Sequence, residues 1–178
     1  MSGMPFRVGC GFDVHRLVPG RPLMLGGIEI PYEKGLEGDS DADVLTHAIL
    51  DAVVGAAGLG DIGVHFGVGR PENMGIASTT LLASMVALVR AHGYRPEGVD
   101  ATIVAEAPRL SALIPAMRER LAGILGLPVR RVNVKSTTAK RLGALGAGEG
   151  IVALAVATLS RRSSRRPGPR LRRRSSLC

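Results

Sequence analysis

The sequence predicts a single α/β domain built on a mixed β-sheet with helices on one face. The chain of 178 residues has the length of one domain, and 46% of its residues are hydrophobic, enough to form a core. Strand-like and helix-like segments follow one another in the order β-β-α-α-β-α-β, without an internal repeat. Such a sheet leaves its other face to a partner, and we expect oligomerisation through that face.

Extended segments open the chain. Residues 6–12 are predicted to form a strand, and residues 16–21, which contain Pro-Gly, are predicted to form a turn. A second extended run is expected over residues 23–30. A loop with one proline and two glycines should then occupy residues 31–38.

A helix is predicted over residues 41–57, with Asp39 or Ser40 as its N-cap and Gly58 in the left-handed conformation at its end. Its apolar residues recur at helical spacing: Val44, Leu45, Ala48, Ile49, Ala52 and Val53. Three polar residues spaced four apart should line its other side: Asp43, His47 and Asp51.

The remaining elements complete the alternation of helices and strands. Residues 66–75 contain three glycines and a proline without a period, which predicts a mobile loop that could cover a substrate. In chain order we then expect a helix over 78–92 ending at Gly93, a strand over 99–105, a helix over 110–125 with Pro115 in its first turns, a strand over 129–135, and a final strand or helix over 150–159.

Asp13, His15 and His47 are candidate ligands of one zinc ion. If the first strand continues past residue 12, Asp13 and His15 share a face while Val14 points the other way. Two imidazoles and one carboxylate, with a fourth position open, form the donor set of a catalytic zinc site. The alternative is a structural role, because an isolated Asp-x-His pair is common and a helical histidine is usually hydrogen-bonded within the fold.

The net charge of +8 originates entirely in the C-terminal segment. Residues 161–178 contain eight arginines and no acidic residue, so residues 1–160 carry no net charge. We therefore assign residues 1–160 to the folded domain and residues 161–178 to a disordered tail rich in Arg and Ser. Composition gives the domain no basic face for nucleic acid, and a polyanion could bind only the tail. A tail without any role is the alternative.

Other features of the composition indicate a cytoplasmic protein. The two cysteines, Cys10 and Cys178, provide no disulfide framework, and the first residues lack the pattern of a signal peptide. The mainly apolar stretch over residues 151–159 is too short for a bilayer, which a helix crosses with about 20 residues. We therefore expect no membrane partner.

The order of several motifs resembles the 2-C-methyl-D-erythritol 2,4-cyclodiphosphate synthase family, over about residues 6–159. The motifs are Gly-Cys-Gly-Phe-Asp-Val-His over 9–15, Gly-Gly-Ile-Glu-Ile-Pro over 26–31, Ser-Asp-Ala-Asp-Val over 40–44 with His47, Gly-Asp-Ile-Gly over 60–63, Ala-Glu-Ala-Pro over 105–108, Asn-Val-Lys-Ser-Thr-Thr over 133–138, and Gly-Glu-Gly over 148–150. The family consists of homotrimeric zinc lyases of the non-mevalonate isoprenoid pathway, with active sites between subunits.

The resemblance implies a substrate and a set of contacts. The family cyclises 4-diphosphocytidyl-2-C-methyl-D-erythritol 2-phosphate and releases cytidine monophosphate (CMP). Zinc ligands would be Asp13, His15 and His47. The residues implied to contact substrate are Asp13, His15, Asp39, Ser40, Asp61, Ile62, Gly63, Ala105, Glu106, Ala107, Pro108, Thr137 and Thr138. Thr138 and Lys140 occupy positions implied to act in catalysis.

Four positions depart from the family pattern. At the position of Lys140 the family has a glutamate, and that glutamate binds a second divalent ion, Mg²⁺ or Mn²⁺. The ammonium of a lysine cannot ligate that ion. The family often has a histidine at the position of Asp39 and an arginine at the position of Ala147. Its loop corresponding to residues 66–71 usually carries aspartates, which this chain lacks there. Two functions therefore remain open: the cyclising lyase, with full or impaired activity, and a silent trimer that binds zinc and a cytidine nucleotide.

Overall fold

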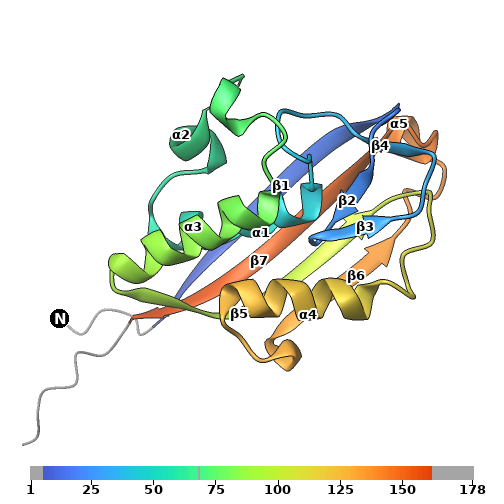
Figure 1. The fold of residues 1–178 in the computed structure, drawn as a ribbon. Helices are drawn as coiled ribbons and strands as arrows, with labels where there is room; N and C mark the ends of the chain where they lie inside the picture. The colour runs from blue at the N-terminus through green and yellow to red at the C-terminus, as the bar shows by residue number, and fades with distance from the viewer. Residues whose placement is uncertain (1–5, 68, 162–178) are drawn as a thin grey trace, which may run out of the picture.

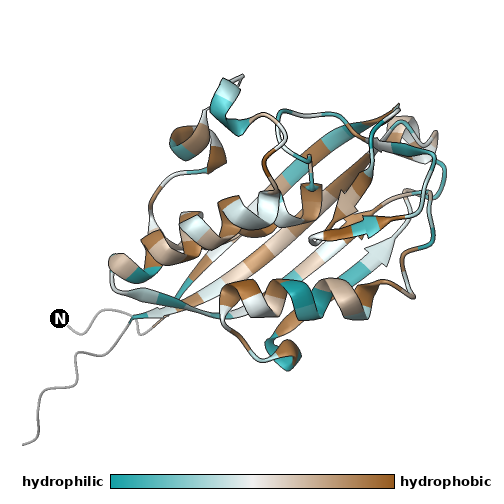
Figure 2. Ribbon diagram, in the orientation of Figure 1, coloured by the Kyte–Doolittle hydropathy of each residue, from teal (hydrophilic) through white to brown (hydrophobic). Residues whose placement is uncertain are grey.

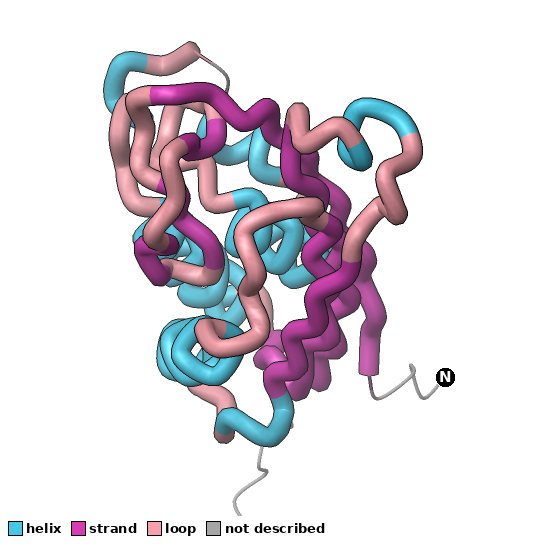
Figure 3. Tube along the Cα trace, turned by 90° about the vertical axis from the view of Figure 1, so that its right-hand side faces the viewer, coloured by secondary structure: helices cyan, strands magenta, loops and turns pink. Residues whose placement is uncertain are grey.

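A mixed sheet of five strands, covered by helices on one face, forms the frame of the molecule (Figures 1 and 3). The computed structural model describes residues 6–67 and 69–161. The strands lie in the order β4-β1-β7-β5-β6, and β2 and β3 form a separate hairpin. The strands are β1 (Phe6–Pro19), β2 (Leu23–Leu25), β3 (Ile28–Ile30), β4 (Lys34–Leu36), β5 (Tyr94–Val104), β6 (Val132–Thr137) and β7 (Gly150–Arg161). The predicted mixed α/β architecture is confirmed.

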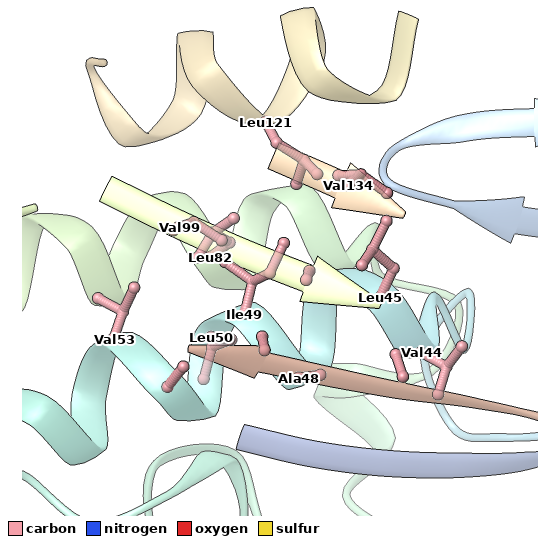
Figure 4. Packing of buried hydrophobic residues seen from close by; sticks show 14 of the residues in the cluster. Val44, Leu45, Ala48, Ile49, Leu50, Val53, Leu82, Val99, Leu121 and Val134 are labelled. Atoms are coloured by element: carbon pink, nitrogen blue, oxygen red, sulfur yellow. The ribbon is translucent and has the colours of Figure 1, made fainter. Parts of the chain in front are cut away.

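The three long helices lie together on one side of this sheet (Figure 3): α1 (Val44–Ala57), α3 (Ser78–Ala91) and α4 (Ile114–Leu125). The short helices are α2 (Ile62–Phe66) and α5 (Gly143–Gly146), and the 3-10 turns are η1 (Pro71–Asn73) and η2 (Val129–Arg131). The core lies between the layers, where Leu45 and Ile49 of α1, Leu82 of α3 and Leu121 of α4 face strands β5 and β6 (Figure 4). In Figure 2, apolar segments run along the central strands, while α4 carries both apolar and polar residues.

Helix α1 packs directly on β1 because two glycines of that strand carry no side chain. A Cβ added to Gly9 would lie 2.1 Å from the carbonyl oxygen of Ala52, and one on Gly11 would lie 2.0 Å from that of Ala48. Real Cβ atoms do not approach oxygen so closely, so a side chain at either position would push the helix away. The Gly-x-Gly spacing thus sets the distance between β1 and α1.

The beginning of α1 differs from the prediction. The helix starts at Val44, and its N-cap is Asp43, not Asp39 or Ser40. The Asp43 carboxylate is fully buried and accepts hydrogen bonds from the backbone N–H groups of Gly26, Gly27 and Thr46 and from the Thr46 hydroxyl. A buried side chain that joins the β2–β3 hairpin to the helix overrides the local capping signal of Ser40. The left-handed C-cap at Gly58 is confirmed.

Several other boundaries also differ. Strand β1 continues through residues 16–19, predicted as a turn, because it pairs with β7 as far as Arg16 and then with β4. The run predicted over 23–30 is the β2–β3 hairpin, which turns at Gly26 and Gly27 with φ of 62° and 72°. The predicted loop 31–38 contains β4. Helix α4 starts four residues later than predicted, β6 starts at Val132, and residues 150–159 belong to a strand.

The sheet face opposite the helices is apolar along β1 and β7. Glycines 9 and 11 face α1, so the alternate residues of β1 point away from the helices. Exposed large hydrophobic side chains on this face are Phe6, Val8, Phe12 and Val14 of β1 and Leu154 and Val156 of β7. Phe12 lies directly opposite Leu154 in the antiparallel pair, so the two rows form one continuous surface. We call these six residues the open-face patch.

Among the helices of the described residues, none has both the length and the apolar character required to span a bilayer. The arginine-rich tail predicted to be disordered begins at residue 161, the last residue of β7, and its other residues lie outside the described part of the chain.

Candidate metal centre and adjoining cavities

Asp13, His15 and His47 converge on one point between β1 and α1. Asp13 Oδ2 lies 2.9 Å from His15 Nε2 and 3.0 Å from His47 Nδ1. The two imidazole nitrogens are 3.4 Å apart, and the three ligand atoms all lie within 4.8 Å of one another. Val14 points to the opposite face and is 51% exposed, as the strand period predicts. The fold thus brings together the three predicted ligands.

Each imidazole has its second nitrogen occupied. His15 Nδ1 lies 2.5 Å from the carbonyl oxygen of Glu37, and His47 Nε2 lies 2.8 Å from the Ser78 hydroxyl. Such outer partners fix the ring orientation of metal-binding histidines. Together with the carboxylate of Asp13, the two nitrogens that face inward form a donor set that suits a zinc ion with an open coordination position.

The electrostatics of the cluster favour an ionised Asp13. Burial alone would raise the pKa of the Asp13 carboxyl, but hydrogen bonds with His15 and His47 hold this pKa well below its ordinary value. Burial alone would lower the pKa of His15, whereas its hydrogen bond with Asp13 and the negative charge of Asp13 raise it. Asp13 is therefore present as the carboxylate, the form that ligates a metal.

A cavity of about 300 Å³ opens beside the three ligands. Its lining residues are Asp13, His15, Gly38, Asp39, Ser40, His47, Asp51, Ile62, Gly63, Phe66, Gly67, Asn73 and Leu81. Of the predicted substrate contacts, Asp39, Ser40, Ile62 and Gly63 thus border the metal cluster. Asp61 directly precedes Ile62 and is the N-cap of α2. Its side chain accepts a hydrogen bond from the backbone N–H of Val64.

Asp39 connects this cavity to the segment predicted to cover it. The Asp39 carboxylate accepts a hydrogen bond of 2.6 Å from the backbone N–H of Gly69, and its carbonyl oxygen accepts one of 2.7 Å from Gly75. Within the segment, the Asn73 amide donates to the carbonyl oxygen of Phe66. The negative charge of Asp39 is therefore directed at the covering segment by a hydrogen bond.

The other predicted contacts surround a second cavity of about 280 Å³ at the ends of β5 and β6. It is lined by Ala105, Glu106, Pro108, Arg109, Leu110, Ser111, Ser136, Thr137 and Thr138. Ala107 precedes Pro108 and is not part of the lining.

Lys140 follows this cavity on an exposed turn. It has a φ of 53°, and its backbone N–H donates to the Thr138 hydroxyl oxygen at 3.3 Å. The next backbone N–H, of Arg141, donates to the Glu106 carboxylate at 3.1 Å. These contacts anchor the backbone of the turn to the cavity wall, while the Lys140 side chain lines neither cavity.

The two cavities are separated within one chain. They share no lining residue. Across the sheet, Val14 lies opposite Val152, Val152 opposite Val104, and Val104 opposite Thr137. Three strand spacings amount to about 14 Å, so the candidate ligands on β1 and Thr137 at the end of β6 lie far apart across the sheet.

Comparison with known proteins identifies the family. The sequence matches the profile of the YgbB family over residues 6–160. The chain belongs to the YgbB family. A protein of Symbiobacterium thermophilum named 2-C-methyl-D-erythritol 2,4-cyclodiphosphate synthase is 54% identical over 155 residues, which cover 87% of this chain and 99% of that protein. A protein of the same name from Burkholderia thailandensis is 55% identical over 161 residues, covering 90% of this chain and 99% of that protein.

Solved structures show the same fold. The bifunctional IspDF protein of Campylobacter jejuni matches with a TM-score of 0.85 and 38% identity, covering 88% of this chain and 42% of that chain. The IspF protein of Plasmodium falciparum in complex with CDP matches with a TM-score of 0.79 and 27% identity, covering 90% of this chain and 99% of that chain. The resemblance drawn from the motifs is confirmed.

Three polar residues of this YgbB family member adjoin the metal cluster but were not among the predicted site residues. Asp51 lines the metal-side cavity, and burial raises the pKa of its carboxyl, partly offset by a hydrogen bond from the backbone N–H of Ile62. The sequence pattern that could have identified Asp51 is its position in the polar stripe of α1, four residues after His47. Ser78 and Asp41 lie behind His47. Asp41 belongs to the Ser-Asp-Ala-Asp-Val motif over 40–44, whereas no local pattern distinguishes Ser78 from an ordinary helix-start residue.

Proposed function

We propose that this YgbB family member converts 4-diphosphocytidyl-2-C-methyl-D-erythritol 2-phosphate into 2-C-methyl-D-erythritol 2,4-cyclodiphosphate and releases CMP, as a lyase of cytoplasmic isoprenoid biosynthesis. The names of relatives that are 54% and 55% identical over nearly their whole length support this reaction. The observation that carries it is the convergence of the Asp13, His15 and His47 ligand atoms within 4.8 Å on the wall of a cavity.

Asp13, His15 and His47 would hold Zn²⁺. The donor set and the hydrogen bonds behind both imidazoles fit this ion. When bound there, zinc supplies a Lewis acid that polarises a phosphate oxygen. The chain itself would orient the methylerythritol part of the substrate through Ser40 and the α2 start at Asp61, Ile62 and Gly63. Asp39 would act on the substrate indirectly, because its carboxylate is directed at the covering segment.

The second cavity would bind the cytidine diphosphate part. Its size and its backbone between Ala105 and Pro108 suit a base, and CDP is present in the complex of the Plasmodium falciparum relative. The hydroxyls of Thr137 and Thr138 are neutral donors suited to phosphate oxygens, where they can stabilise charge that develops on the diphosphate.

A homotrimer would bring the two halves of the site together. Within one chain about 14 Å separate the strands that carry them, so a neighbouring copy is needed to set its nucleotide cavity against the metal ligands. The open-face patch supports this arrangement, because six large hydrophobic side chains on one sheet face are typical of a surface that packs against another subunit.

Lys140 would take over a role that the second divalent ion has in the family. Among the described residues, Asp13, His15 and His47 form the only group of three His, Cys, Asp or Glu side chains close enough to hold a metal. No carboxylate stands at position 140, so the residues present do not fit a second ion there. The turn that carries Lys140 is anchored to Thr138 and Glu106 beside the second cavity, and we propose that the Lys140 ammonium would neutralise the diphosphate as a point charge.

An assay of CMP release tests this function. The full chain is loaded with zinc and assayed without other metals, then with added Mg²⁺ or Mn²⁺. We expect release with zinc alone, because Lys140 supplies the second positive charge. No release under any metal condition would support the alternative, a silent trimer that binds zinc and a cytidine nucleotide, for which the exchanges at Lys140 and Asp39 are the motivation.

A further inference from the structure

The His47 ring is held between the metal cluster on one side and two buried hydroxyls on the other. Its Nδ1 lies 3.0 Å from Asp13 Oδ2, and its Nε2 lies 2.8 Å from Ser78 Oγ and 3.2 Å from Ser40 Oγ, which is itself 3.3 Å from Ser78 Oγ. Ser78 is fully buried, and His47 is 7% exposed. The contact between Nε2 and Ser78 is therefore shielded from water, so the pairing of donor and acceptor in it must be complete.

The Ser78 hydroxyl also contacts Asp41, which decides the direction of the hydrogen bonds. Ser78 Oγ donates its single hydrogen to Asp41 Oδ1, because an ionised carboxylate can only accept. The oxygen of Ser78 is then left with lone pairs toward His47, so His47 Nε2 must carry the hydrogen of that contact. The remaining lone pair of the ring is at Nδ1, the nitrogen that faces Asp13 and His15.

Ser78 is available for this contact because it does not cap its helix. It is the first residue of α3, and the N-cap position is taken by Ala77, which offers no side-chain oxygen. Two backbone hydrogen bonds fasten the segment before α3 to the one before α1: Asp41 N–H to the Ile76 carbonyl at 3.0 Å and Gly75 N–H to the Asp39 carbonyl at 2.7 Å. Ser78 and Asp41 are thus held in place by the backbone on both sides.

We propose that Asp41 and Ser78 are positioning residues that fix His47 as an Nδ1 ligand and thereby raise the affinity of the metal site. The proposal rests on the metal site of the proposed function, but not on turnover. Neither residue lines the cavity beside the ligands, so their influence on a bound metal would pass through His47. Removing an outer partner of a metal-binding histidine typically weakens metal affinity by about 10–100-fold.

The test measures the zinc affinity of the full chain by competition with a chromogenic chelator. We expect Ser78→Ala to bind zinc about 10–100-fold more weakly and Ser78→Thr, which keeps the hydroxyl, to retain more affinity. Ser84→Ala is the matched control: it removes a hydroxyl from the same helix that bonds only to the Leu81 carbonyl, and its affinity should not change. Zinc affinity of Ser78→Ala within twofold of the unsubstituted chain would overturn the proposal.

A variant at Asp41 and the visible spectrum of the cobalt-loaded protein distinguish a change at the metal site from a folding defect of Ser78→Ala. In Asp41→Ala the Ser78 hydroxyl loses its carboxylate acceptor, which frees the hydroxyl hydrogen to turn toward His47 and favours the wrong tautomer. We expect weaker zinc binding and an altered visible spectrum of the cobalt-loaded protein. If Ser78→Ala fails to fold, this variant decides, and an unchanged affinity with an unchanged cobalt spectrum overturns the proposal. An unsubstituted chain that binds no zinc would overturn both this proposal and the zinc site, whereas zinc binding without CMP release would contradict only the proposed reaction.

Discussion

Gly11 of β1 meets Ala48 of α1 so closely that a Cβ on the glycine would lie 2.0 Å from the alanine carbonyl oxygen. His47 directly precedes Ala48, and Asp13 follows Gly11 by two residues on the same strand face. The close packing of the two backbones therefore sets the distance between the metal ligands of the strand and the ligand of the helix. Gly11 therefore positions the candidate site as well as allowing the helix to pack on the strand.

We expect Gly11→Ala to displace α1 and damage the metal site. Overpacking of this kind typically costs about 1–3 kcal/mol of unfolding free energy, measured by urea denaturation without metal, and zinc affinity should fall as well. Gly55→Ala is the control within α1: a Cβ there meets nothing within 4 Å, so that variant should be more stable by about 0.5–1 kcal/mol. Equal zinc affinity in the two variants would contradict the argument.

We expect His47→Ala to lose stabilisation by zinc. A ligand present at 100 times its dissociation constant stabilises the folded state by about 2.7 kcal/mol, so zinc should raise the melting temperature of the unsubstituted chain and not that of the variant. His92→Ala is the control, because the exposed His92 ring bonds only to the Leu88 carbonyl. A zinc-dependent rise that survives in His47→Ala would show that the metal binds elsewhere.

We expect Asp43→Ala to be among the most destabilising single changes in α1. Its carboxylate accepts four hydrogen bonds, three of them buried and the one from Gly27 partly buried, and a buried donor left without a partner costs about 1–3 kcal/mol. Loss of more than about 3 kcal/mol in urea unfolding is therefore expected. Asp61→Ala removes a similar cap from the short, exposed helix α2 and should cost only about 1 kcal/mol. Similar losses in both variants would mean that burial of the cap does not matter.

Glu97 should contribute stability at neutral pH that disappears in acid. Hydrogen bonds from Ser160, Arg95 and Arg131 hold the pKa of the Glu97 carboxyl below its ordinary value of 4.5. A carboxyl with a lowered folded pKa stabilises the protein above its unfolded pKa, and this contribution is lost as the pH falls through the folded pKa.

Glu97→Gln should therefore melt lower than the unsubstituted chain at pH 7, by about 1–3 °C for a surface cluster. This difference should shrink as the pH falls below about 4.5. Thermal unfolding between pH 3 and 7 measures it, with the exposed Glu119→Gln on α4 as the control. If the difference in melting temperature between Glu97→Gln and the unsubstituted chain widened in acid, that result would contradict a lowered pKa of Glu97.

Lys140→Glu should change the metal requirement of CMP release. The variant regains a carboxylate, so we expect its release to depend on added Mg²⁺ or Mn²⁺, while Lys140→Ala should be slower by about 10²–10³-fold under all conditions. Lys34→Ala on the distant strand β4 controls for loss of a lysine elsewhere. Unchanged release in Lys140→Ala would show that the ammonium takes no part.

The convergence of the three candidate metal ligands could be predicted because it depends on short-range regularities. The strand period places Asp13 and His15 on one face, and the polar stripe of α1 presents His47. The N-cap of α1 could not be predicted, since Asp43 is selected over Ser40 by its buried contacts with Gly26 and Gly27, 17 and 16 residues earlier in the chain. The hairpin at these glycines was missed because two short apolar strands look like one extended run.

Local patterns and the order of the motifs were enough to predict the family, the α/β alternation and the three candidate metal ligands. Tertiary packing was needed to show which nitrogen of His47 faces the metal cluster, how Ser78 and Asp41 lie behind that ring, and that the cavity at the ends of β5 and β6 is separate from the cavity beside the cluster. These features depend on contacts between segments far apart in the chain, such as α1 with α3 and β1 with β6 through two intervening strands. Such contacts follow from how the layers pack, and no local pattern encodes them.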